Sequence, residues 1–214
     1  QYLCDELPAT LKILYLTYNK LLKLDAKAKI RNSNTTVTNY HGFAFMSLKK
    51  IGVKAGISDL IQRFNKEKPM LEHYDVLIID EYQDIELELA EMLKHIKSTN
   101  SNIQIIAVGD MAQKIYDKTT LDVPVFMKQF LGGHINLQFT SCFRLSTDLA
   151  SMLGRVWQKK IIGVNNNCIV EKMTVKAVVN FLTEQNPEDI LCLGARWGDL
   201  SDTLNLLEEK CPTK

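Results

Sequence analysis

Two neighbouring carboxylates follow one of the most apolar stretches of the chain. Tyr74–Ile79 (YDVLII) runs directly into the sequence D-E-Y-Q-D, which begins with Asp80 and Glu81. Acidic side chains are rarely buried unless they are paired or bound to metal, so their position needs a reason. A carboxylate at a strand tip can hold the Mg²⁺ of a nucleotide, while its neighbour positions the water that attacks a phosphate. The alternative is that both acids begin a solvated loop and cap the next helix.

A second strand end repeats this pattern. Ile105–Gln113 (IIAVGDMAQ) passes from an apolar run into Gly-Asp and then, three residues later, into a glutamine. Gly109 permits a close backbone approach, and Asp110 and Gln113 can reach a neighbouring phosphate or its water. By itself this segment is typical of a turn. Two strand tips with similar polar endings predict a nucleotide site.

Apolar runs that alternate with amphipathic stretches predict the elements that position these tips. Because the runs are too apolar to be half solvated, they indicate an α/β fold with a parallel sheet covered by helices on both faces. Ligands of such sheets bind at the carboxyl ends of the strands. The predicted strands and extended segments are Leu11–Thr17, Thr35–Thr38, Tyr74–Ile79, Ile103–Val108, Ile135–Gln138 and Asp189–Leu193. The predicted helices are Leu21–Ile30, Phe43–Lys50, Asp59–Asn65, Glu86–Lys97, Ser146–Trp157 (N-capped by Ser146), Val175–Thr183 and Asp199–Glu209.

The composition excludes several classes of protein. With 214 residues, 46% of them apolar and 24% charged, the chain is neither a disordered segment nor a coiled coil. No apolar run approaches the roughly 20 residues that span a bilayer, so no membrane partner is expected. The five cysteines form no C-x-x-C pair, which argues against a zinc site or a disulfide framework and favours a reducing, cytoplasmic compartment.

Five segments, in order, resemble the motifs of the UvrD/Rep-like superfamily 1 DNA helicases. The resemblance covers most of residues 11–157 and implies a RecA-like, P-loop NTPase-type three-layer sandwich, incomplete in this chain. The segments are Ile13–Lys20 (ILYLTYNK), Val37–Phe43 (VTNYHGF), Val76–Asp84 (VLIIDEYQD), Val108–Tyr116 (VGDMAQKIY) and Leu137–Trp157 (LQFTSCFRLSTDLASMLGRVW).

The resemblance implies different roles for the polar residues of the D-E-Y-Q-D segment. Asp80 would help to hold Mg²⁺, and Glu81 would be the general base for the hydrolytic water. Gln83 and Asp84 would connect this site to neighbouring elements.

Three further residues complete the implied ATP site. Gln113 would sense the γ-phosphate, and Arg144 would contact it as a charge clamp, a role that a planar guanidinium suits. Phe143, where the family usually has Tyr, would stack on adenine; otherwise its ring is a core residue.

The first two segments carry the implied DNA contacts. Stacking on aromatic rings tolerates any base sequence, which suits a motor that moves along a single strand. Thr17, Asn19 and Lys20 would hold phosphates, Tyr18 would stack a base, and Tyr40 and His41 would lie beside them. Taken without the resemblance, Tyr18 and His41 are core or structural residues.

The chain departs from the family pattern in several places. It contains no G-x-x-x-x-G-K-[ST] phosphate-binding loop, and Gln1–Leu7 resembles the helix that follows that loop. Motifs that follow in the family beyond residue 214 are missing too, so we expect a fragment. Asn39 replaces the usual Thr before the aromatic-His pair, and Asp117–Thr120 replaces an aromatic-Arg-Gly segment after Tyr116.

The expected function is therefore that of part of an ATP-dependent DNA helicase or translocase. Residues 1–141 would form most of the first RecA-like motor domain, and residues 142–214 the beginning of the second. ATP and Mg²⁺ would be the cofactors, and single-stranded DNA or a single/double-strand junction the partner, while the oligomeric state is left open. Little or no ATP hydrolysis is expected from these 214 residues alone.

Two alternatives remain at this point. The first is a non-catalytic helicase-like module that senses nucleotide or docks on another protein. The second is a motor that acts on RNA, because backbone contacts barely distinguish the 2′-hydroxyl.

The net charge of +1 results from the cancellation of local charges. Residues 1–70 carry a net charge of +7, residues 71–122 of −7, residues 123–176 of +5 and residues 177–214 of −4. Both implied DNA motifs and Arg144 lie in the basic segments, and the implied metal site lies in an acidic one. The segment charges thus permit a local basic groove, although solvated faces would explain them too.

Overall fold

The computed structural model describes residues 2–114, 120–194 and 196–211, and these form two compact units, one up to Ile135 and one from Asn136. Tyr116 and residues 117–119, which the motif comparison singled out, lie outside the described residues. Within those ranges no helix is both long and apolar enough to cross a membrane.

The first unit is an alternation of strands and helices. Its strands are β1 (Ile13–Thr17), β2 (Thr35–Asn39), β3 (Val76–Asp80) and β4 (Gln104–Val108). Its helices are α1 (Tyr2–Glu6), α2 (Lys20–Lys29), α3 (Tyr40–Lys50), α4 (Leu60–Glu67), α5 (Leu87–Thr99) and α6 (Val123–Leu131), with 3-10 turns η1 (Tyr82–Asp84) and η2 (Met111–Gln113).

The four strands form one parallel sheet in the order β2-β1-β3-β4. Tyr15 of β1 is paired with Val37 of β2 and with Ile78 of β3, so β1 and β3 occupy the centre. Since central strands of a covered sheet meet helices on both faces, their residues are almost entirely buried.

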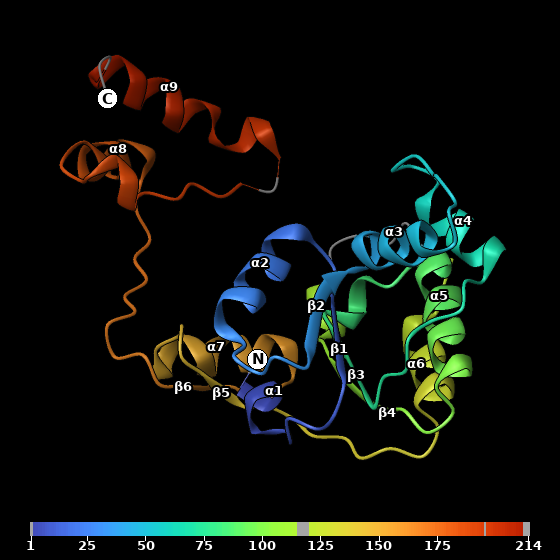
Figure 1. The fold of residues 1–214 in the computed structure, drawn as a ribbon. Helices are drawn as coiled ribbons and strands as arrows, with labels where there is room; N and C mark the ends of the chain where they lie inside the picture. Colours follow the sequence, from blue (N-terminus) through green and yellow to red (C-terminus); the bar gives the residue numbers. More distant parts are fainter. Residues whose placement is uncertain (1, 115–119, 195, 212–214) are drawn as a thin grey trace. The chain divides into compact units, whose positions relative to one another are not determined.

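Helices cover both faces of this sheet (Figure 1). Leu14, Leu16, Leu77 and Ile79 pack with residues of α3, α4, α5 and α6, whereas the alternate residues of the same strands pack with α1 and α2. This alternation follows from the two-residue period of a strand. The predicted α/β class, with a parallel sheet between two helical layers as in P-loop NTPases, is confirmed.

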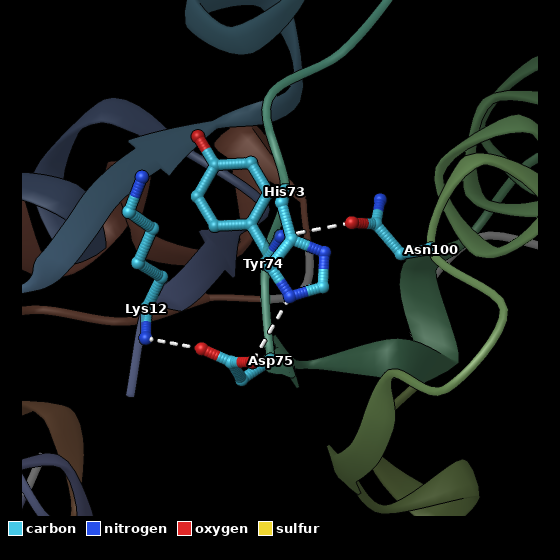
Figure 2. Close-up of polar contacts among 5 residues, drawn as sticks. All are labelled: Lys12, His73, Tyr74, Asp75 and Asn100. Atoms are coloured by element: carbon cyan, nitrogen blue, oxygen red, sulfur yellow. Dashed lines mark hydrogen bonds and ion pairs between the residues drawn. The ribbon is translucent and has the colours of Figure 1, made fainter. Parts of the chain in front are cut away.

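Polar side chains form hydrogen bonds at the amino edge of the sheet (Figure 2). Asp75, just before β3, accepts a hydrogen bond from the Lys12 backbone nitrogen (2.8 Å), and its other carboxylate oxygen lies 3.0 Å from His73 Nε2. Asn100, which is buried after α5, accepts a hydrogen bond from the Tyr74 backbone nitrogen (2.8 Å) and donates to the Ile96 carbonyl. These side chains therefore connect the starts of β1 and β3 to the end of α5.

The second unit contains α7 (Thr147–Trp157), α8 (Val175–Thr183) and α9 (Ser201–Lys210). Two-residue strands, β5 (Ser141–Cys142) and β6 (Ile162–Gly163), pair in parallel. The 3-10 turns η3 (Pro187–Asp189) and η4 (Trp197–Leu200) complete the unit. Ser146 caps α7 by accepting a hydrogen bond from the Leu149 backbone nitrogen, as the sequence predicted.

Two predicted strands are wrong. Ile135–Gln138 and Asp189–Leu193 are not strands, and neither belongs to the two sheets formed by the described residues. Their apolar side chains are open to solvent, with Leu137 88% and Leu191 81% exposed. A strand needs a hydrogen-bonded neighbour as well as an apolar pattern, and these segments have none among the described residues.

Within the part of the chain that the structure describes, the α-helix α6 was not predicted. The helix α6 follows Asp122, whose side chain accepts a hydrogen bond from the Val125 backbone nitrogen, and Pro124 lies in its first turn. This cap and this proline are ordinary signals of a helix start.

Candidate functional site

The carboxyl ends of the four strands lie at one edge of the sheet, because all four are parallel. The strands end at Thr17, Asn39, Asp80 and Val108. Asp80 and Glu81 at the end of β3 and the Gly-Asp pair after β4 are therefore neighbours, although they are far apart in the chain. The structure thus brings the two predicted strand tips together.

Asp80 is the last residue of β3 and is partly exposed. Its Oδ2 accepts a hydrogen bond of 2.8 Å from the hydroxyl of Tyr15 in the neighbouring strand. Burial, together with this hydrogen bond and the nearby negative charge, raises the pKa of Tyr15, so the hydroxyl stays protonated as a donor. Among the described residues no hydrogen bond reaches Oδ1, so one carboxylate oxygen can bind a ligand.

Glu81 has a left-handed backbone conformation, with φ +56°. For a residue other than glycine this conformation costs about 1–3 kcal/mol and is found most often at functional sites. The side-chain nitrogen Nε2 of Gln83 donates a hydrogen bond of 2.5 Å to Glu81 Oε2. The side-chain oxygen Oε1 of Gln83 accepts a hydrogen bond of 3.1 Å from the Asp110 backbone nitrogen. The buried Gln83 therefore holds the Glu81 carboxylate and connects it to the segment after β4.

Gly109 makes this connection possible. A Cβ atom there would lie 2.6 Å from Gln83 Oε1 and 2.9 Å from the Tyr82 backbone nitrogen, closer than side chains tolerate. The close approach predicted for Gly109 is thus to the η1 turn of this same chain. Glycine is required because Tyr82 and Gln83 pack directly on the end of β4.

Asp110 and Gln113 form their own turn at this edge. Asp110 Oδ1 accepts a hydrogen bond from the Ala112 backbone nitrogen, and Oδ2 accepts a bond of 3.3 Å from the Gln113 side chain. Gln113 is exposed. Burial raises the pKa of Asp84 despite the opposing effect of Lys114, so this acid is less readily ionised than a solvated aspartate.

The residues predicted to contact DNA divide into exposed and buried ones. Tyr18, Lys20 and His41 are exposed after the neighbouring strands β1 and β2. Tyr40 is only 2% exposed and belongs to the core. Its ring therefore has no face open to a base, which argues against its predicted place beside DNA. Its sequence position, at the start of α3, could not distinguish these cases.

Two of the predicted phosphate contacts have structural roles. Thr17 is fully buried and its hydroxyl donates to the Asn19 carbonyl. The Asn19 side chain caps α2 by accepting a hydrogen bond of 2.9 Å from the Leu22 backbone nitrogen. Lys20 is therefore the strongest candidate in this segment for a contact with phosphate.

Phe143 and Arg144 belong to the second unit, immediately after β5. Both side chains are exposed. Their roles toward adenine and the γ-phosphate stay predictions.

Tyr15 also lies at this edge, although the sequence did not single it out. It lies within the apolar run of β1, where a tyrosine is an ordinary core residue. Its hydroxyl could have indicated a polar contact, because a buried tyrosine hydroxyl needs a hydrogen-bond partner.

Comparison with known proteins identifies the family of this chain. A family model described as an AAA domain matches residues 10–119, slightly more than half of the chain. The matched span contains β1 to β4 and the whole carboxyl edge described above. A comparison with curated proteins finds no match.

Proposed function

The chain belongs to the AAA domain family, whose members are P-loop nucleotide hydrolases, and from this premise we propose that it is part of an ATP-dependent DNA helicase or translocase. The observation that carries the proposal is the arrangement of Asp80 and Glu81 at the carboxyl edge of the sheet. One carboxylate has an open oxygen, and the other is held by Gln83.

The donor chemistry at Asp80 is suited to Mg²⁺. No group of three or more His, Cys, Asp or Glu side chains within the described ranges could hold a metal by itself. Mg²⁺ is usually bound by one or two carboxylates together with phosphate oxygens and water, so a single open carboxylate fits Mg²⁺ that arrives with a nucleotide. When bound, Mg²⁺ would neutralise negative charge on the phosphate oxygens.

Glu81 is the proposed general base. Its carboxylate is partly exposed, so water can reach it, and the hydrogen bond from Gln83 fixes its orientation. Because Gln83 is also bound to the Asp110 backbone, the position of Glu81 depends on the segment that contains Gln113. Gln113 would sense the γ-phosphate, Phe143 would stack on adenine, and Arg144 would clamp the transferred phosphoryl group.

The proposed path of single-stranded DNA runs over the loops after β1 and β2. Lys20 would contact a phosphate, Tyr18 would stack on a base and His41 would lie beside them, since all three side chains are exposed there. Residues 142–214 would contribute the start of a second motor domain.

The decisive experiment measures ATP turnover by the intact protein, with and without single-stranded DNA. Glu81→Gln should lower DNA-stimulated turnover by about 100-fold or more, the usual effect of removing a general base. Glu86→Gln is the matched control, because Glu86 is exposed in the same loop and its side chain does not cap α5. Turnover of the Glu81→Gln protein at the wild-type level would refute the assigned base.

The non-catalytic alternative is a helicase-like module that senses nucleotide or docks on another protein without hydrolysing ATP. It predicts nucleotide binding without turnover, also in the intact protein. The proposal requires turnover that depends on Mg²⁺, and its absence under conditions where DNA is bound would favour the alternative.

The DNA contact can be measured on the 214-residue chain by fluorescence anisotropy with a labelled single strand. Lys20→Ala should weaken binding and reduce the slope of log K against log salt by about 0.7, the value for one phosphate contact on a single strand. Lys27→Ala, in the last turn of the same helix, is the control. Equal effects of both substitutions would contradict a specific contact at Lys20, and preference for an RNA strand would favour the RNA alternative.

A further inference from the structure

Tyr15 and Asp80 project from the same face of the sheet. Ile13, Tyr15, Val76 and Ile78 all pack in the cluster beneath α1 and α2, and Asp80 follows Ile78 by two residues. Since side chains of one face recur at every second residue, Asp80 is the next side chain on that face. Tyr15 is paired with Ile78, so the length of its side chain brings the hydroxyl to the level of Asp80.

The hydroxyl is the part of the Tyr15 side chain that contacts the candidate site. The ring is 5% exposed and packs among aliphatic side chains, a position that phenylalanine would fill equally well. The hydroxyl adds one hydrogen bond, and its acceptor is Asp80 Oδ2 at 2.8 Å. A buried donor of this kind limits the rotation of a carboxylate, because turning the group would leave the hydroxyl unsatisfied.

We propose that Tyr15 is a positioning residue, whose hydroxyl occupies Oδ2 of Asp80 and so presents Oδ1 to a divalent cation. The inference rests on the proposed function, in which Asp80 holds Mg²⁺. Side chains that orient a metal ligand through its second oxygen or nitrogen affect metal affinity without touching the metal. Tyr15 acts in this way through Asp80.

The test uses Mn²⁺ as the probe and the 214-residue chain in solution. Mn²⁺ broadens the NMR signals of nearby backbone amides even when it binds weakly, so the amides of Glu81 and Tyr82 report occupancy at Asp80. Wild type should show selective broadening there, and Asp80→Asn should abolish it. Tyr15→Phe should need about 10-fold more Mn²⁺ for half-maximal broadening, the lower end of the usual effect of losing such a partner.

Tyr74→Phe is the matched control. Tyr74 is also buried, and its hydroxyl is hydrogen-bonded to Thr36, but it lies six residues before Asp80, about 20 Å away along an extended strand. It should lower stability without changing the Mn²⁺ titration. An Mn²⁺ affinity of Tyr15→Phe within twofold of wild type would overturn the role of Tyr15.

The same experiment separates this proposal from the proposed function. If wild type and Asp80→Asn broaden equally, Asp80 is not a metal ligand, so the metal role that the proposed function gives to Asp80 fails together with the role of Tyr15. If Asp80→Asn loses the signal while Tyr15→Phe keeps it, only the role of Tyr15 fails. A double-mutant cycle of unfolding free energies for Tyr15→Phe and Asp80→Asn gives a second readout, because a Tyr15 that served packing alone would show no coupling with Asp80.

Discussion

The two edges of the sheet differ in the groups that hold their key polar side chains: backbone nitrogens hold Asp75 and Asn100 at the amino edge, whereas other side chains hold the carboxylates of Asp80 and Glu81 at the carboxyl edge. Asp75 and Asn100 accept hydrogen bonds from the backbone nitrogens of Lys12 and Tyr74. Asp80 and Glu81 accept theirs from the side chains of Tyr15 and Gln83.

This difference separates a structural cluster from a candidate site. Backbone nitrogens cannot move away without disturbing the fold, so Asp75 and Asn100 stabilise the sheet. Side-chain donors orient a carboxylate while its remaining oxygen is available to a ligand, and the left-handed backbone of Glu81 adds strain at the same place. Whether an acid at a strand end has a structural role or belongs to a site therefore depends on the groups that donate hydrogen bonds to it. We expect the amino edge to contribute more to stability than the carboxyl edge.

The largest effect should come from Asn100→Ala. The substitution leaves the backbone nitrogen of Tyr74 without a partner in a buried place and removes the donor to Ile96 as well. We expect the free energy of unfolding to fall by about 3 kcal/mol, as measured by urea denaturation. Asn102→Ala, at an exposed position, is the control and should change it by less than about 0.5 kcal/mol. Similar changes in the unfolding free energy for both variants would contradict the stabilising role of Asn100 at the amino edge.

Gly109→Ala should have the largest effect on stability at the carboxyl edge. The new methyl group collides with Tyr82 and Gln83, so η1 must shift, at a cost of about 2 kcal/mol. Gly133→Ala is the control, because a Cβ atom there meets nothing within 4 Å and φ is not positive. Denaturation of both variants checks the difference, and an unchanged Gly109→Ala protein would show that η1 does not pack as described.

The amino edge should also give the protein a pH dependence at acid pH. The hydrogen bond from the Lys12 backbone, and then His73, hold the pKa of Asp75 below its ordinary value of about 3.9. This stabilisation is complete above that value and is lost as the pH falls through the lower pKa of the folded state. Asp75→Asn should therefore lose less stability than wild type between about pH 5 and about pH 2 in urea titrations. Parallel curves would exclude this contribution.

The smallest effect should come from Tyr40→Phe. The hydroxyl of Tyr40 is buried without a hydrogen-bond partner among the described residues, so its removal abolishes an unsatisfied group. We expect stability to stay unchanged or to rise by up to about 1 kcal/mol. Tyr74→Phe, which loses the bond to Thr36, should fall by about 1 kcal/mol instead. A clear loss for Tyr40→Phe would show that a bound water satisfies the hydroxyl.

Most of the sheet could be predicted from the sequence, because three of its four strands are short apolar runs followed by polar residues. The runs before Thr17, Asp80 and Val108 became β1, β3 and β4, and the D-E-Y-Q-D segment stands at a strand tip. Ile135–Gln138 failed by the same rule, since an apolar pattern shows that a segment can pair and not that a partner exists.

The sequence by itself determined the alternation of elements, the parallel sheet and the position of Asp80 and Glu81 at its carboxyl edge. These features follow from local periodicity, which is readable within a few residues. Only the tertiary structure decided that Tyr15 binds Asp80, that Gly109 packs on Gln83, and that Tyr40 is buried. Each of these depends on register or burial between segments far apart in the chain, and no local pattern encodes such a distance.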